Sequence, residues 1–177
     1  MRIQELQSDI NKTFKELLEI ISSVQQDQIN IVPFEGSWTA GQVAEHIILS
    51  VSGFEEVMNG PVAETKRAPD ELKEKIKASF LDFTTKMKSP DFIVPEYKNY
   101  EKDDLIKTLE NLREKIIQAI ETLDLTKTCL AFELPVLGFL TRLESIYFIL
   151  YHTQRHIHQI KGIYQKIKET KSHVAEK

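Results

Sequence analysis

The sequence predicts an all-α protein built as a four-helix bundle, and three observations lead to this fold class. Four segments repeat apolar residues at spacings of three and four, which is the period of a helix with one buried face. Clusters of turn-forming residues, such as Asn-Gly-Pro at 59–61, fall between the segments. A long connection, residues 59–101, separates the second segment from the third and allows these two helices to run parallel through a crossover.

The first helix is predicted from about residue 2 to residue 27. Its apolar residues recur along one stripe: Ile3, Leu6, Ile10, Phe14, Leu17, Leu18 and Ile21. A stripe of this kind is the face that a helix buries against its neighbours. Pro33 and Gly36 follow and separate the first helix from the second.

The second helix has a well-marked start at Thr39. The hydroxyl of Thr39 suits an N-cap, and Gln42, three residues later, completes a capping box. The helix should end near Met58, because the turn-forming residues 59–61 follow directly.

The connection at 59–101 contains two weaker elements. The stretch APDELKEKIKASFLDFTTKM predicts a short amphipathic helix opened by Pro69 and Asp70. The stretch SPDFIVPEY predicts an extended segment held by Pro90 and Pro95.

The third helix is predicted from about Lys102 to Leu123, and the last from near Thr141 to beyond Ile167. Between them, CLAFELPVLGFL is apolar and interrupted by proline and glycine, so we expect a loop that packs over one end of the bundle. We expect residues 1–170 to form a single domain and the polar residues 171–177 to form a frayed tail.

Composition excludes several classes of protein. The formal net charge is −4 and no Lys/Arg run is mixed with aromatic residues, which argues against nucleic acid as a partner. No apolar run has the length of a membrane span or a secretory signal, so we expect no membrane partner and a cytoplasmic protein. Cys129 is the single cysteine; it cannot form an internal disulfide, and we expect it to act as a small apolar residue.

The histidines are the side chains best suited to chemistry. His152 and His156 are four residues apart, so they lie on one face of the last helix and can point at one ion. His46, among apolar residues of the second helix, is the best third ligand. By helical position His158 faces water, and His173 lies in the polar tail, so we place both outside the site. These positions predict a three-histidine metal site inside the bundle.

Other interpretations of these residues are possible, and the sequence limits what kind of metal site they could form. Histidines at this spacing also occur as hydrogen-bonded residues at the edge of a core, without any metal. Thr153 stands where the general-base glutamate of an HExxH motif would be, which argues against a metalloprotease. Gln42 and Gln159, each one helical turn from a histidine, are candidates for orienting the ligands or contacting substrate, although both also suit an ordinary polar helix surface.

Two motifs resemble the DinB/YfiT-like family. The segment SWTAGQVAEHI is similar to its pattern W-[ST]-x-x-[EQ]-x-x-x-H, and the closing segment is similar to a helix that ends H-x-x-R-H-x-x-Q-I. The resemblance implies an up-down-down-up bundle and a divalent metal held at His46, His152 and His156. Arg155 matches the arginine of the pattern, and by helical position we expect it to point toward solvent as a structural or interface residue.

The resemblance also implies a function. Three imidazoles leave open positions on a metal, as a catalytic site requires, so we expect a bound water or thiol to be the reacting group. Zinc or nickel is the expected ion, with iron or manganese as alternatives. Family relatives use such an ion to activate a low-molecular-weight thiol, so a thiol S-transferase is expected, or a related hydrolase, acting as a homodimer on a small thiol and an electrophile. The alternative is a non-catalytic metal-binding or stress-response interaction protein.

Overall fold

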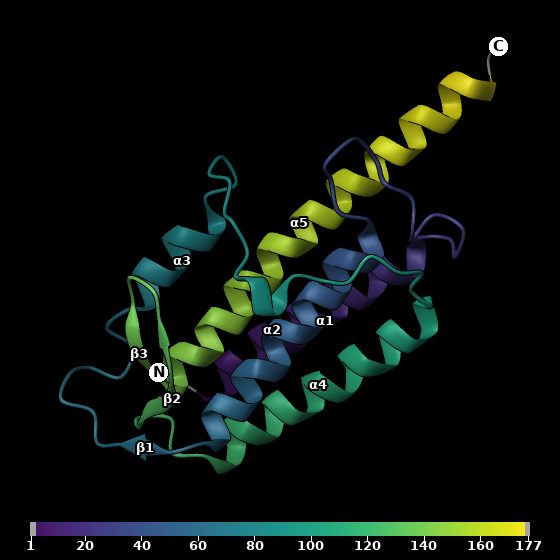
Figure 1. Cartoon of the computed structure of the whole chain (residues 1–177). Coiled ribbons are helices and arrows are strands. Elements are labelled where there is room, and N and C mark those ends of the chain that lie inside the picture. Colours follow the sequence, from purple (N-terminus) through teal and green to yellow (C-terminus); the bar gives the residue numbers. More distant parts are fainter. Residues whose placement is uncertain (1–2, 176–177) are drawn as a thin grey trace.

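The computed structural model describes the backbone of residues 3–175 and the side chains of residues 3–170. Its elements, in chain order, are α1 (Ile3–Ser23), α2 (Ala40–Asn59), β1 (Val62–Ala63), α3 (Lys73–Leu81), the 3-10 helix η1 (Asp91–Ile93), α4 (Lys102–Thr122), β2 (Thr128–Leu134), β3 (Gly138–Thr141) and α5 (Arg142–Ala175). Figure 1 shows α1, α2, α4 and α5 packed as a bundle, with α3 beside α5 and the small sheet at one end.

The predicted all-α bundle is confirmed, and its core is made by the apolar stripes. Phe14 of α1, Ile47 of α2, Ile116 of α4 and Ile160 of α5 are all fully buried in one hydrophobic cluster. Burying each such side chain stabilises the fold by about 1.5–3 kcal/mol relative to leaving it in water. The bundle therefore rests on the same residues that define the helical period in the sequence.

The start of α2 follows the predicted capping box. Thr39 Oγ1 accepts from the Gln42 backbone N–H, and Gln42 Oε1 accepts from the Thr39 backbone N–H, both at 3.0 Å. The same motif starts α5: Thr141 Oγ1 accepts from the Glu144 N–H at 3.1 Å, and Glu144 Oε2 accepts from the Thr141 N–H at 2.9 Å. Each box satisfies two backbone donors that the first helical turn leaves unpaired.

The expectation of a loop at CLAFELPVLGFL is wrong. This segment forms β2 and β3, which pair antiparallel, and β1 pairs with the other edge of β2. Pro135 and Val136 lie in the turn of this hairpin and Gly138 begins β3; Val136 and Gly138 have φ values of 71° and 74°. Proline and glycine do mark a turn there, but strand pairing across that turn depends on contacts that the local pattern does not contain.

The connection between α2 and α4, residues 60–101 and called the crossover below, is also more structured than predicted. α3 begins at Lys73 and ends at Leu81, so the predicted amphipathic helix is shorter than its sequence stretch. The segment SPDFIVPEY, expected to be extended, contains η1. Ile76 and Phe80 are the buried residues of α3, and they place this helix against the bundle.

The ends of α2 and α4 lie at the same end of the bundle. β1 follows α2 and pairs with β2, which follows α4, with Val62 opposite Cys129. β3 leads directly into α5, so the sheet connects the C-terminal ends of α2 and α4 with the N-terminal end of α5 (Figure 1). α1 and α5 lie side by side: Gln154 donates to Thr13, and Tyr164 donates to the Ser23 carbonyl.

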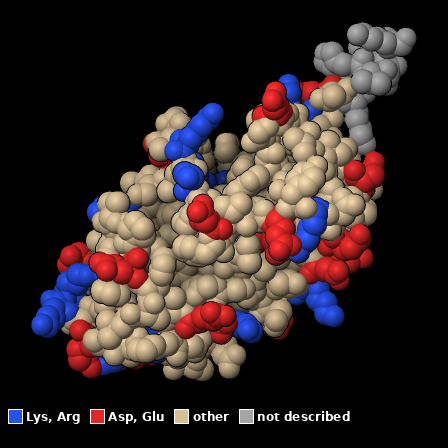
Figure 2. Space-filling model, viewed as in Figure 1, with Lys and Arg blue, Asp and Glu red and all other residues tan. Residues whose placement is uncertain are grey.

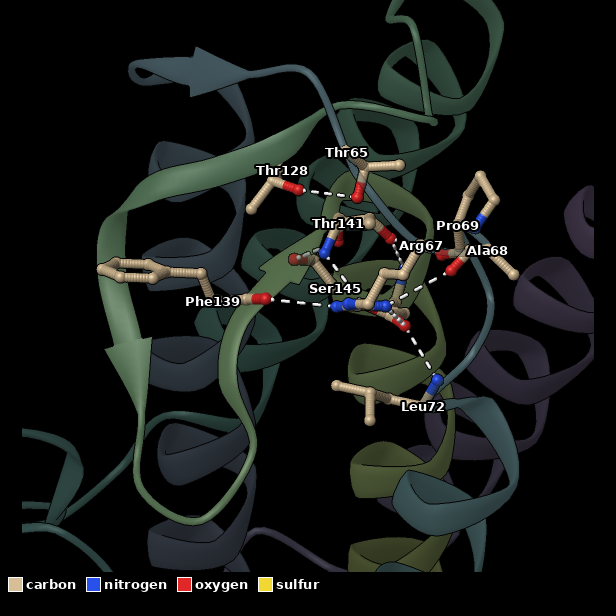
Figure 3. Close-up of polar contacts among 10 residues, drawn as sticks. Thr65, Arg67, Ala68, Pro69, Leu72, Thr128, Phe139, Thr141 and Ser145 are labelled. Atoms are coloured by element: carbon tan, nitrogen blue, oxygen red, sulfur yellow. Dashed lines mark hydrogen bonds and ion pairs between the residues drawn. The ribbon is translucent and has the colours of Figure 1, made fainter.

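An ion pair fastens the crossover to α5 (Figure 3). Arg67 donates from both terminal nitrogens to the two carboxylate oxygens of Glu144, which is fully buried. The same carboxylate accepts the backbone N–H of Leu72 at 2.8 Å. Arg67 also donates to the carbonyl of Phe139 at 3.2 Å, so the pair joins crossover, β3 and α5.

The surface carries no continuous basic area on the face shown in Figure 2, where Lys and Arg are scattered among Asp and Glu. Within residues 3–175, no helix is long and apolar enough to cross a membrane. α5 reaches Ala175, whereas the side chains of the predicted frayed tail, residues 171–177, lie outside the described residues.

Candidate metal centre

Two bundle helices bring the three predicted histidines together. His46 comes from the second turn of α2, while His152 and His156 lie one turn apart on α5. All three are buried, with 3%, 5% and 8% of their surfaces exposed. Their potential ligand atoms all lie within 4.8 Å of one another, and in the described part of the chain this is the one such group of metal-binding side chains.

The Nε2 atoms are the ones that converge. The Nε2 atom of His152 lies 3.1 Å from Nε2 of His46 and 3.1 Å from Nε2 of His156. Imidazole nitrogens bound to zinc at roughly 2.0–2.1 Å, in a tetrahedral arrangement, lie about 3.3 Å apart. The spacing of the histidines therefore fits one shared ion.

Hydrogen bonds orient two of the three rings. Nδ1 of His46 lies 2.8 Å from the carbonyl oxygen of Ile93, and Nδ1 of His156 lies 2.8 Å from Oε1 of Gln159. Because both partners are acceptors, both Nδ1 atoms carry the proton, and both Nε2 atoms present a lone pair. Hydrogen bonding at the far nitrogen is the usual way in which a protein fixes the tautomer of a metal-binding histidine.

These lone pairs cannot all be satisfied within the cluster. His152 Nε2 can donate one proton, to His46 or to His156, and the Nε2 lone pair of the other histidine is then left without a donor. In addition, His152 Nδ1 is buried without a hydrogen-bond partner among the described residues. A cation bound at the three Nε2 atoms would pair every converging lone pair at once, so the donor set fits a metal ion.

Burial keeps the imidazoles neutral. It lowers the pKa of His46, although the hydrogen bond to Ile93 partly opposes the shift. Burial, together with the neighbouring histidines, sets the pKa of His152 well below its usual value. Burial also lowers the pKa of His156 to about 3. Neutral imidazole is the form that binds a metal, so the site is prepared to bind without first losing protons.

Aromatic side chains surround the cluster. The ring centroid of Trp38 lies 5.1 Å from that of His46, and the rings of Phe80 and Phe148 lie 5.4 Å and 5.5 Å from that of His152. Phe80 belongs to α3, so the crossover forms one wall of the site. An apolar wall excludes water and strengthens the electrostatic interactions inside.

The other predicted residues fall in different places. Gln159 contacts His156, as a ligand-orienting residue would, whereas the side-chain oxygen of Gln42 is engaged in the helix cap. His158 is exposed, and its ring stacks on Phe83 at 4.2 Å between centroids. Cys129 is fully buried, and burial raises the pKa of its thiol, as expected of an unreactive apolar residue.

Arg155 has a structural role, as expected, but the expectation that it points toward solvent is wrong. Its guanidinium donates to the carbonyls of Phe80 at 3.1 Å and Asp82 at 2.8 Å, and also to the carbonyl of Thr85. The arginine therefore fastens the end of α3, and with it Phe80, to the helix that carries two histidines. Helical position predicts the direction of a side chain, but it takes no account of a crossover that folds over that face.

Two contributors to the site carry no sequence signal. The carbonyl of Ile93 orients His46, but a backbone carbonyl is the same in every residue. Phe80 is one of several apolar residues in the crossover, and its place beside His152 depends on how α3 packs. The resemblance at the helix motifs points to the ligands but not to these neighbours.

The fold and the histidine cluster together define the class of protein. The model of the DinB superfamily matches residues 9–160, and the chain belongs to this family. One relative is YuaE of Bacillus subtilis (strain 168), which is described as an uncharacterized protein. The two sequences are 25% identical over 165 residues, which cover 90% of this chain and 98% of YuaE.

Two solved structures share the fold. One is YfiT from Bacillus subtilis, which is described as a probable metal-dependent hydrolase with an unusual four-helix bundle topology. It superposes with a TM-score of 0.61 and 14% sequence identity, over 94% of this chain and 88% of YfiT. TT2238, described as a four-helix bundle protein, superposes with a TM-score of 0.58 and 16% identity, over 91% of this chain and 99% of its own.

Proposed function

We propose that this protein is a metal-dependent enzyme whose divalent transition-metal ion is bound by His46, His152 and His156. The observation that carries the proposal is the convergence of three Nε2 atoms on buried, neutral imidazoles. Zinc and nickel both suit imidazole ligands, and iron or manganese are alternatives. A metal site is further supported by the description of YfiT as a probable metal-dependent hydrolase.

The residues of the chain have separate roles in this proposal. Ile93 and Gln159 hold the protons on the far nitrogens of His46 and His156, so that both rings face the ion as acceptors. Arg155 holds the end of α3 against α5, which keeps the Phe80 ring beside His152. Three protein ligands leave further positions for a reacting group.

Within this class we propose thiol S-transfer as the reaction. When bound, the ion acts as a Lewis acid that makes a nucleophile available by lowering the pKa of a water or removing the proton of a thiol outright. In the described residues, the metal-binding cluster contains the three histidines and no carboxylate that could act as a general base. A thiol needs that base less than water does, because its ordinary pKa of about 8.5 is far lower.

Hydrolysis is the second candidate, favoured by the description of YfiT. It would use the same three histidines with water as the nucleophile. The third candidate, a non-catalytic metal-binding or interaction protein, needs the same ligands but no turnover. Binding and activity must therefore be measured separately.

The binding test compares the wild-type protein with His46→Ala. Metal analysis after dialysis against zinc or nickel is expected to find one ion per chain in the wild type and none in the variant, with equal helical content by circular dichroism. Full retention of metal in His46→Ala contradicts the site.

The activity test uses zinc-loaded and nickel-loaded protein with a panel of small thiols and a model electrophile, and in parallel with ester and amide substrates. Conjugation that requires thiol and disappears in His152→Ala supports S-transfer, whereas release of acid from the esters or amides supports hydrolysis. Bound metal without either activity favours the interaction protein.

We also propose that the protein forms a homodimer. Phe92, Tyr97 and Val136 are strongly exposed apolar or aromatic residues; the first two lie in the segment SPDFIVPEY and the third in the turn between β2 and β3. Contact between two copies would remove part of this surface from water. Sedimentation velocity at micromolar concentration tests the proposal, and a monomer contradicts it.

The up-down-down-up order of the bundle helices is part of the same proposal. It is supported by the pairing of β1 with β2, which sets the ends of α2 and α4 together, and by the contacts of α1 with α5. An experimental structure of the protein would test this order.

A further inference from the structure

A polar cavity lies between α1, the start of α3 and α5. Its volume is about 220 Å³, and its polar lining comprises Glu5 and Asp9 of α1, Asp70 and Lys73 of the crossover, and Tyr147 and Tyr151 of α5. This is smaller than the roughly 300–1,000 Å³ of pockets that hold drug-sized ligands. A short aliphatic compound fits such a volume, but a nucleotide or a peptide does not.

Two parallel tyrosine rings make one wall of the cavity. The rings of Tyr147 and Tyr151 are stacked, with centroids 6.0 Å apart and an angle of 9° between their planes. The ammonium of Lys73 lies 4.8 Å from the centroid of the Tyr147 ring. The Tyr147 ring therefore already makes a cation–π contact with the Lys73 ammonium.

Tyr151 is the residue that points to a ligand. It is only 7% exposed, it lines the cavity, and its hydroxyl has no hydrogen-bond partner among the residues that the structure describes. The hydroxyl oxygen is open to the cavity, so a molecule bound there can supply the hydrogen-bond partner that the described residues do not. Burial, together with the negative charge of Glu74 and Asp9, raises the pKa of Tyr151 to about 12, so the hydroxyl keeps its proton.

The charges of the cavity favour a cation. Glu5, Asp9 and Asp70 supply three carboxylates against the single ammonium of Lys73, and none of the three carboxylates forms an ion pair with a described lysine or arginine. In the described part of the chain, the one group of side chains close enough to share a metal ion is the histidine cluster. These carboxylates are therefore too far apart to chelate one ion, and an organic cation spans them better.

We propose that this cavity binds a small aliphatic amine, with the ammonium group or groups held by Asp9 and its neighbouring carboxylates and with the Tyr151 hydroxyl completing the contacts. The alkyl part packs against the tyrosine rings. Binding of this kind is independent of the metal centre, because none of the three histidines lines the cavity.

The test measures binding of putrescine to metal-free protein by isothermal titration calorimetry. We expect saturable binding of one putrescine per chain, weaker binding of n-butylamine and none of n-butanol, because the carboxylates recognise charge. Asp9→Asn should weaken putrescine binding about tenfold, the effect of losing a charge-assisted hydrogen bond. Tyr151→Phe, which removes only the hydroxyl, should weaken it about fivefold.

Two variants act as controls. Asp104→Asn makes the same change of acid to amide at an exposed position on α4 and should leave binding unchanged. His46→Ala should also bind putrescine normally, which separates this cavity from amine binding at a metal. The proposal is overturned if putrescine fails to saturate at millimolar concentration, if Asp9→Asn and Tyr151→Phe bind like the wild type, or if His46→Ala abolishes binding.

Discussion

Two buried polar clusters lie on α5, and they differ in how completely their polar atoms are bonded. At the start of the helix, the Glu144 carboxylate accepts four hydrogen bonds, two from Arg67 and one each from the Leu72 and Thr141 backbones. About two turns later, the histidine cluster leaves His152 Nδ1 without a partner among the described residues. We call the Glu144 cluster closed, because its carboxylate oxygens all have partners, and the histidine cluster open, because one of its buried nitrogens has none.

The difference separates two uses of buried polarity. A buried charge is tolerated when all of its hydrogen bonds are made, and the Glu144 cluster then joins β3, the crossover and α5. A partly satisfied network costs free energy in the folded protein unless something else completes it. We therefore expect removal of a partner to damage stability at Glu144, and to damage ligand binding at the histidines.

The largest effect is expected from Glu144→Ala. The substitution leaves Arg67 without its partner and removes the acceptor of two backbone N–H groups, so the free energy of unfolding should fall by about 3 kcal/mol, at the lower end for a broken buried pair because water reaches Arg67. Urea denaturation measures this loss.

Glu110→Ala makes the same change at an exposed position on α4, and it should alter the free energy of unfolding by less than about 0.5 kcal/mol. A loss below about 1 kcal/mol in Glu144→Ala would show that the ion pair of Arg67 with Glu144, drawn in Figure 3, does not stabilise the fold.

The second effect is stabilisation by metal. If an ion binds the converging Nε2 atoms of the open cluster, zinc at a free concentration 100 times the dissociation constant should raise the free energy of unfolding by about 2.7 kcal/mol. Thermal denaturation of the wild type with and without zinc measures the shift. His46→Ala should show none, and an equal shift in both proteins would place the zinc elsewhere.

A smaller effect is expected from Gln159→Ala. Without the amide oxygen, the proton on His156 Nδ1 loses its acceptor, and metal affinity should fall about tenfold, the lower end for an orienting partner. Competition with a chelator measures the affinity. His158→Ala is the neighbouring control and should change affinity by less than about twofold, since surface substitutions rarely exceed 0.5 kcal/mol.

The smallest effect is expected from His152→Leu in metal-free protein. Leucine removes the unpartnered Nδ1 from the core, which offsets the loss of the contacts to His46 and His156, so the free energy of unfolding should change by less than about 1 kcal/mol. Urea denaturation alongside Glu144→Ala makes the comparison direct. Equal losses in the two variants would remove the distinction between the closed and the open cluster.

The helices and their caps were predictable because their signals are local. Thr39 and Gln42 form the cap that their spacing predicts. Five of the seven stripe residues of α1 are buried: Leu6, Ile10, Phe14, Leu17 and Ile21. The hairpin at residues 128–141 was missed because its strands are defined by pairing with each other and with β1. A proline and a glycine mark the turn without indicating what pairs across it.

For the candidate site, the sequence by itself predicted the three histidines, because helical spacing places His152 and His156 on one face and His46 lies among apolar residues of the second helix. The tertiary structure alone decided which nitrogens converge, since a carbonyl on the crossover orients His46 and could belong to any residue. It also decided the direction of Arg155, because the crossover brings three backbone acceptors over a face that helical position assigns to water. Periodicity indicates which face of a helix is buried. The groups that contact this face belong to distant segments of the chain, so their positions depend on how those segments pack.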